Sequence, residues 1–239
     1  MSEAKVWVDT PFKLIPSSKS GAELGKEPKG AQKLACEMTL VHNAILRGLN
    51  AVYNQARSVS TKGTRKDKLD FANFAYAWTM VLKEHHRVEE DRVFPLINEL
   101  TGVPGLMDGN VAEHQEFHDG FEAYLEYADK AREHLEHDID TLLALDKYSD
   151  KVDWVVWFKK VIDEIMGYAM KNAEFRTDEF PMTIILHDET FDEGMWQNFP
   201  PIPWLFALLL RWMFMYRRKD WWRFSGCDFA SQPQQLPFA

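Results

Sequence analysis

The stretch 71–97 constrains the fold more strongly than any other part of the sequence. Apolar residues recur in it at steps of three and four, the spacing that lines one face of an α-helix. These residues are Phe71, Phe74, Ala75, Trp78, Val81 and Leu82. The same face continues onto His85 and Glu89, which lie one helical turn apart and point in the same direction. A buried imidazole and a buried carboxylate each need a partner. A metal ion can be that partner, and a hydrogen bond between the two side chains is the alternative.

The composition is that of a globular protein large enough for one sizeable domain. Of the 239 residues, 46% are hydrophobic and 27% are charged. The net charge of -9 argues against general nucleic-acid binding, which usually needs a basic surface. Cys36 and Cys227 show neither metal nor redox spacing, and the segment MSEAKVWVDT lacks a secretory pattern. We therefore expect a cytoplasmic protein without a disulfide framework and without a nucleic-acid partner.

Histidines recur on the apolar faces of other predicted helices. His42 lies in the stripe of a helix that starts near Gln32. A lone histidine on an apolar face is more often a structural core residue than a ligand, so His42 alone does not indicate a metal site. His114 and His118 lie one turn apart in a helix that follows Pro104. Two buried imidazoles at this spacing repel each other when protonated and lack partners when neutral, so this pair predicts metal ligation.

A fourth helical pattern carries a second histidine–carboxylate pair, His134 and Asp138, again one turn apart. The neighbouring residues His86 and Glu90 lie about 100° around the second helix and are assigned to its flank or to a second shell. Five imidazoles and two carboxylates on four helices match a two-metal, carboxylate-bridged site in the core of a four-helix bundle.

These segments resemble the hemerythrin-like (HHE cation-binding) family. The resemblance is carried by His42 and by the motifs HHRVEEDRVFP, EHQEFH and HLEHDI. It is closest to fungal hemerythrin-like proteins, through GVPGLMDGNV, FPPIP, WWRF and LPF. The resemblance implies an all-α, up-down four-helix bundle that holds two non-haem irons, bridged by two carboxylates and an oxo group. Its implied ligands are His42, His85, Glu89, His114, His118, His134 and Asp138, with Glu89 and Asp138 bridging.

The same resemblance implies a protein that binds or senses O2 or NO, or that senses iron. A di-iron oxidoreductase acting on peroxide, NO or an organic substrate is the alternative, and a metal-free helical scaffold is another. The sequence leaves open whether the protein is an enzyme, and its protein partners are unknown.

Closure of the bundle requires a turn between the third and fourth helices. Neither Gly nor Pro occurs between Gly120 and Gly167. An uninterrupted helix would separate His118 from His134 by about 24 Å, so the chain must turn back near residues 126–130. If it continues straight, the fourth bundle position falls to 152–173, where Met170 and Glu174 replace His and Asp.

Three regions follow from these patterns: an N-terminal arm over residues 1–30, the bundle over 31–147, and a helical C-terminal extension over 148–239 packed on the bundle.

The most apolar run, 204–216, is shorter than the roughly 20 residues that a membrane-spanning helix needs. Basic residues interleaved with Trp221 and Trp222 follow it. A helix packed on the bundle is preferred here, and an interfacial membrane helix or a partner surface is the alternative. His187 is assigned a structural role.

Overall fold

The computed structural model describes residues 8–23, 26–118, 137–169, 171, 173, 175–199 and 203–239. Over these residues the regular structure is helical, apart from one isolated antiparallel bridge between Cys227 and Pro233. The predicted all-α fold is therefore confirmed. No helix in the described ranges combines the length and apolarity needed to cross a membrane.

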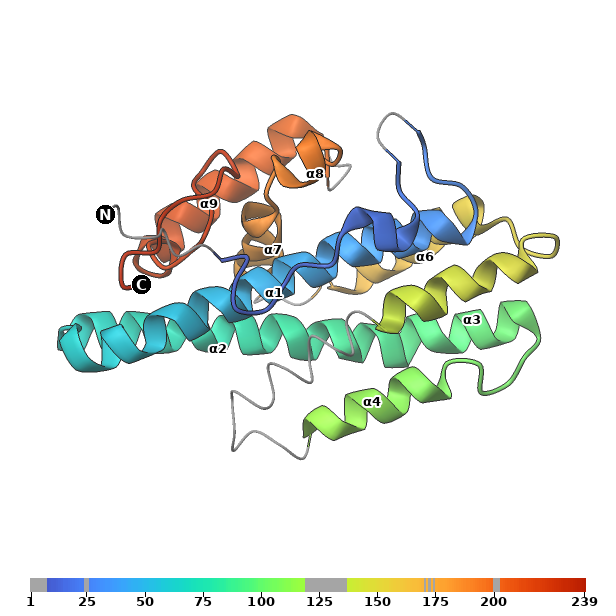
Figure 1. The fold of residues 1–239 in the computed structure, drawn as a ribbon, viewed down its shortest axis with the longest axis horizontal. Coiled ribbons are helices and arrows are strands. Elements are labelled where there is room, and N and C mark those ends of the chain that lie inside the picture. Colours follow the sequence, from blue (N-terminus) through green and yellow to red (C-terminus); the bar gives the residue numbers. More distant parts are fainter. Residues whose placement is uncertain are drawn as a thin grey trace. The chain divides into compact units, whose positions relative to one another are not determined.

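Two long helices form an antiparallel hairpin (Figure 1). They are α1 (Ala31–Lys62) and α2 (Arg65–Val88), joined at Gly63 and Thr64. The following elements are η2 (Glu89–Val93), α3 (Phe94–Thr101), α4 (Asp108–His118), a helix over residues 137–144, η3 (Leu145–Tyr148) and α6 (Trp154–Ala169). The chain then forms η4 (Phe175–Glu179), α7 (Phe180–Leu186), α8 (Phe191–Gly194) and α9 (Trp204–Trp222). A short 3-10 turn, η1 (Ser17–Ser20), precedes α1.

Both π-helical turns, η2 and η4, directly precede a Phe-Pro pair at the start of the next helix. Pro95 and Pro181 have no backbone N–H to donate to the carbonyl four residues earlier. A wider π turn is a common way for a helix to absorb such a missing bond. The sequence thus places the wide turn of η2 at Glu89, where the side-chain register of the helix changes.

Helix α3 ends at Thr101. Gly102 caps α3 with a left-handed backbone, at φ 66°, and its N–H donates to the carbonyl of Glu99. Glycine tolerates this conformation without strain. The segment 102–107 then leads into α4, where the N–H of Met107 donates to Oδ1 of Asn98.

The chain forms two compact units. The first contains Met1–Leu14, Asn43–Leu82 and Asn172–Ala239, and the second contains Ile15–His42 and Lys83–Lys171. Both α1 and α2 contribute residues to each unit. The boundaries predicted at residues 30 and 147 remain predictions.

The C-terminal segment closes the core of the first unit. The ring of Phe224 packs against Phe71 and Phe74, with centroids 5.2 and 5.8 Å away. The Arg223 guanidinium donates to carboxylates of Asp67 and Asp70 on α2. Residues after α9 are thereby attached to the first turns of α2, near the connection between α1 and α2.

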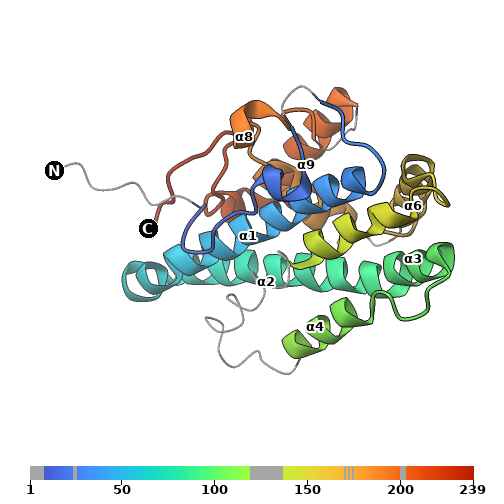
Figure 2. The same ribbon diagram turned by 45° about the vertical axis from the view of Figure 1, so that its right-hand side comes forward.

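The second unit brings four helical segments together. In both views the run from η2 to α3 lies between α4 and the helix of residues 137–144 (Figures 1 and 2). Apolar side chains of these elements are fully buried, among them Leu40, Ile97, Met107 and Ile139. Polar side chains are buried with them, and these form the candidate site.

Candidate metal centre

Five histidine and carboxylate side chains from four helical segments converge in the second unit. They are His42 on α1, His85 on α2, Glu89 at the start of η2, His114 on α4 and Asp138 on the helix of residues 137–144. Four of them are at least 97% buried, and the side chain of His85 is 12% exposed. The polar atoms of these side chains are therefore removed from bulk water.

The ligand-type atoms of the five side chains face one another. The Nε2 atoms of His42 and His85 lie 3.0 Å apart. Oε2 of Glu89 is 3.6 Å from Nε2 of His85 and 3.6 Å from Nε2 of His114. Oδ2 of Asp138 lies 3.9 Å from Nε2 of His42. Neutral imidazoles and carboxylates at these separations have the donor chemistry of transition-metal sites.

Two groups of three residues can each hold a cation, and they share one carboxylate. His42, His85 and Glu89 form the first, and Glu89, His114 and Asp138 form the second. Within each group the ligand atoms lie within 4.8 Å of one another. A carboxylate has two oxygens, so the shared Glu89 can contact both cation positions.

Burial strongly affects the two carboxylates. Desolvation, with the nearby charges of Asp138 and Glu90, raises the pKa of Glu89 well above its usual value. Desolvation also raises the pKa of Asp138, although the hydrogen bond from Asn110 opposes the shift. Oε2 of Glu89 is buried and has no hydrogen-bond partner among the described residues. Such an orphaned anionic atom beside three imidazoles fits a bound cation, which would favour the charged form of both carboxylates.

Neighbouring side chains orient the candidate ligands. The Glu90 carboxylate pairs with Nδ1 of His114 at 2.7 Å, so the histidine's Nδ1 is the protonated nitrogen and its Nε2 faces Glu89. Nδ2 of Asn110 donates to Oδ1 of Asp138. The ring of His86 stacks on that of His114, with centroids 4.0 Å apart. These contacts fix the ring and carboxylate orientations around the cluster.

The comparisons with known proteins agree with this geometry. Residues 37–156 match the model of the hemerythrin HHE cation-binding domain. The chain belongs to this family. A curated relative, the "Dimeric xanthone biosynthesis cluster protein R11" of Cryptosporiopsis sp. (strain 8999), is 28% identical over 98% of this chain and 94% of its own length. No solved structure matches the chain.

The structure brings five of the seven predicted hemerythrin-like site residues together. His118 ends α4, and its side chain lies outside the described residues, as does all of His134. Asp138 lies at the cluster, so the fourth bundle position is taken by the helix of residues 137–144 and not by 152–173. The alternative residues Met170 and Glu174 lie outside the described part of the chain.

Sequence reasoning placed His86 and Glu90 beside the candidate ligands and missed Asn110. The Glu90 carboxylate contacts Nδ1 of His114, and the ring of His86 is 95% buried and stacks on the ring of His114. His187 has the structural contact expected of it, because its Nε2 donates to the carbonyl of Trp196. Asn110 was missed, although it lies one turn before His114 and so shares its helix face.

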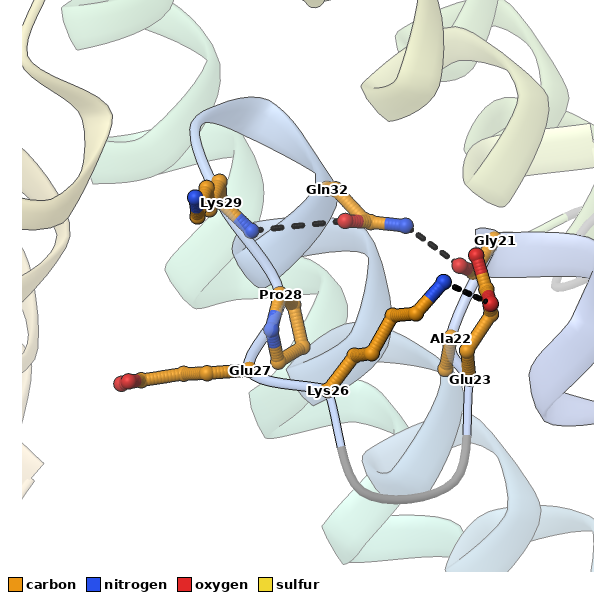
Figure 3. Close-up of a pocket in the computed structure, with 8 residues that line it drawn as sticks. All are labelled: Gly21, Ala22, Glu23, Lys26, Glu27, Pro28, Lys29 and Gln32. Carbon is orange, nitrogen blue, oxygen red and sulfur yellow. Dashed lines mark hydrogen bonds and ion pairs between the residues drawn. The ribbon is translucent and has the colours of Figure 1, made fainter.

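A separate surface pocket is formed by the segment before α1 (Figure 3). Its lining residues are Gly21, Ala22, Glu23, Lys26, Glu27, Pro28, Lys29 and Gln32. Lys26 pairs with Glu23, and the Gln32 amide joins Gly21 to Lys29. These polar groups satisfy one another, and none of the cluster residues lines the pocket.

Proposed function

We propose that the protein is a cytoplasmic, non-haem di-iron protein that binds or senses a small ligand such as O2 or NO, or that senses iron. The observation that carries this proposal is the shared Glu89, which belongs to both three-residue groups. Membership of a cation-binding family supports it independently. A site for a single iron would need only one of the two three-residue groups that share Glu89.

The proposed ligands fall into two sets. His42 and His85 would hold one iron, His114 would hold the other, and Glu89 would contact both, since it belongs to both groups. Asp138 would be the second shared carboxylate, because it belongs to the second group and its Oδ2 lies 3.9 Å from Nε2 of His42 in the first. His118 and His134 complete the set through the family resemblance alone.

Neighbouring residues of the chain fix the tautomer of His114 and the orientation of the Asp138 carboxylate. Glu90 keeps the proton on Nδ1 of His114, so that Nε2 carries the lone pair and faces Glu89. Asn110 holds the other oxygen of Asp138, which limits rotation of that carboxylate. Iron in this site would supply a redox-active centre with an affinity for O2 and NO. Histidine-rich ligation favours reversible binding, because enzymes that activate O2 usually have more carboxylate ligands.

The second candidate function is a di-iron oxidoreductase that acts on an organic substrate. The name of the curated relative favours it, since that protein is assigned to a biosynthesis cluster for dimeric xanthones. In this alternative the substrate is a phenolic polycyclic aromatic compound.

Elemental analysis and an optical spectrum of the aerobically purified protein test the proposal. We expect about two irons per chain with near-ultraviolet absorption typical of a bridged pair, since a shared carboxylate holds two metals close together. One iron or none after anaerobic reconstitution with ferrous ion would contradict it and favour the metal-free scaffold. Spectra that return unchanged through cycles of O2 or NO addition and removal indicate a binding protein. Conversion of a phenolic substrate indicates the oxidoreductase.

A further inference from the structure

Helix α9 presents a row of large apolar side chains to solvent. Exposed fractions range from 41% for Leu208 to 77% for Tyr216. The exposed residues are Trp204, Leu205, Phe206, Leu208, Leu209, Trp212 and Tyr216. Isolated apolar side chains on a surface are ordinary, but a contiguous set of this size marks an interaction site.

All of these exposed side chains except Phe206 lie on one face of the helix. At 100° per residue, Trp204, Leu208, Trp212 and Tyr216 form a stripe that Leu205 and Leu209 widen. Leu210 and Phe214 point the other way and are buried, each at most 4% exposed. Trp212 and Tyr216 stack with their ring centroids 5.9 Å apart. The helix therefore has a packed side and a separate, wholly apolar exposed side, here named the α9 face.

The α9 face is too short to cross a bilayer. From Trp204 to Tyr216 the helix rises about 18 Å, against a hydrocarbon thickness of about 30 Å. The backbone then kinks at Arg218, which has φ -122° and ψ 29°. An apolar strip of this length can lie in the plane of a membrane surface, with its side chains among the acyl chains near the headgroups.

Positive charge gathers beside the α9 face, although the whole chain carries -9. Residues 204–222 contain four basic residues, Arg211, Arg217, Arg218 and Lys219, and one acidic residue, Asp220. Two of the cations are neutralised, since Arg211 pairs with Glu189 and Arg218 pairs with Asp178. Arg217 and Lys219 are exposed and form no ion pair with any residue in the described ranges. They follow the stripe immediately, where they can contact anionic headgroups.

We propose that α9 binds the surface of membranes that contain anionic phospholipid, lying parallel to the surface with the α9 face inserted. The two tryptophans and the tyrosine suit the headgroup boundary, because their rings combine an apolar body with a polar N–H or O–H. Arg217 and Lys219 add attraction to anionic lipid, which salt weakens. The protein would thus associate reversibly with a membrane.

Vesicle flotation tests this proposal on the full chain. The probes are vesicles of phosphatidylcholine alone and vesicles that also contain phosphatidylserine. Leu209→Glu and Trp212→Glu place a charge on the α9 face at residues that are 55% and 64% exposed, so they should leave folding intact. Val156→Glu is the matched control, since Val156 is 66% exposed on α6. Thermal denaturation followed by circular dichroism checks that each variant folds. Sedimentation without lipid gives the oligomeric state of each variant.

We expect the wild type and Val156→Glu to float with the anionic vesicles, and the two α9 variants to bind roughly tenfold more weakly. Arg217→Glu together with Lys219→Glu should reduce flotation with anionic vesicles more than with neutral ones. Equal flotation of the wild type and the α9 variants would overturn the proposal, as would a wild type that binds neither vesicle. A wild-type dimer that does not float, and that Leu209→Glu or Trp212→Glu converts to monomer, would also overturn it by assigning the face to a second copy.

Discussion

Nε2 of His42 and Nε2 of His85 lie 3.0 Å apart in the core, although the two residues are 43 positions apart in sequence. Their rings meet edge to face, at an interplanar angle of 86°. As a hydrogen bond, this contact requires a proton on one Nε2 and none on the other. As a ligand pair, it requires both Nε2 atoms to be unprotonated, so that they could hold a cation together with Glu89. The two interpretations predict different effects of removing one ring.

Replacing His85 by alanine should abolish tight iron binding, because it removes one ligand of the group that contains His42 and Glu89. His86→Ala, at the adjacent position, should leave most of the iron in place, since His86 contacts the ring of His114 and belongs to neither group. Elemental analysis of both purified variants makes the comparison. The reverse pattern, with iron retained in His85→Ala and lost in His86→Ala, would refute the assignment of the helix face.

Glu90→Ala should weaken iron binding by about 10- to 100-fold, the usual cost of losing a partner that orients a histidine ligand. The matched control is Glu113→Ala, because Glu113 makes the same kind of contact to Nδ1 of the exposed His137, at 2.6 Å. Competition with a chromophoric chelator gives both affinities.

Glu90→Gln removes the charge at position 90 but keeps a group that can orient the His114 ring, since the amide oxygen can still accept a hydrogen bond from Nδ1 of His114. Partial recovery of affinity relative to Glu90→Ala is the expected result. Equal losses in Glu90→Ala and Glu113→Ala would show that the contact has no specific role at the cluster.

The sequence predicted the helical class and much of the cluster because both depend on local spacing. His85 and Glu89 follow an apolar stripe at three- and four-residue steps, and such a stripe must face a core. His42 was ambiguous, because a single histidine on an apolar face does not reveal what another helix places opposite it. The contact with His85 is a tertiary relationship that no local spacing encodes.

The orientation of α9 was unpredictable for a related reason. The run 204–216 is apolar nearly all around the helix, so periodicity cannot select the face that packs. The structure buries Leu210 and Phe214 and leaves the opposite face exposed. The wide turn at Glu89 was not predicted either, although it directly precedes the Phe94–Pro95 pair.

Gly48→Ala should destabilise the protein by about 1–3 kcal/mol, the typical cost of overpacking a close-packed core. A Cβ atom at Gly48 would lie 2.1 Å from the ring of Trp78, which is 98% buried. Glycine is therefore needed at this point for α1 and α2 to approach each other. Thermal denaturation should show a melting temperature lower by several degrees.

Gly109→Ala is the control for this substitution. Nothing lies within 4 Å of a Cβ atom at Gly109 in α4, so alanine should be neutral or stabilise by up to about 1 kcal/mol through its higher helix propensity. Similar melting temperatures for the two variants would show that Trp78 can move aside.

His187 should make the stability of the protein depend on pH. Burial, with the nearby cations Arg47 and Arg211, lowers the pKa of His187 from 6.5 to about 4, and the opposing effects of the hydrogen bond to Trp196 and the charge of Asp188 are smaller. Between these two pKa values the unfolded chain binds more protons than the folded chain does. The stability from this group is therefore present above pH 6.5 and is lost as the pH falls toward 4.

Replacing His187 by glutamine should remove this dependence, because an amide does not titrate and can still donate to the Trp196 carbonyl. At about pH 5 the wild type should have lost about 2 kcal/mol of this contribution relative to about pH 8, and the variant should have lost none of it. Urea unfolding at both pH values measures the difference. If the two proteins lose equal stability on acidification, His187 is protonated in the folded state or opens to solvent before the chain unfolds. A larger loss in the variant would mean that the imidazole is charged in the native protein and that its contact with Asp188 outweighs its burial.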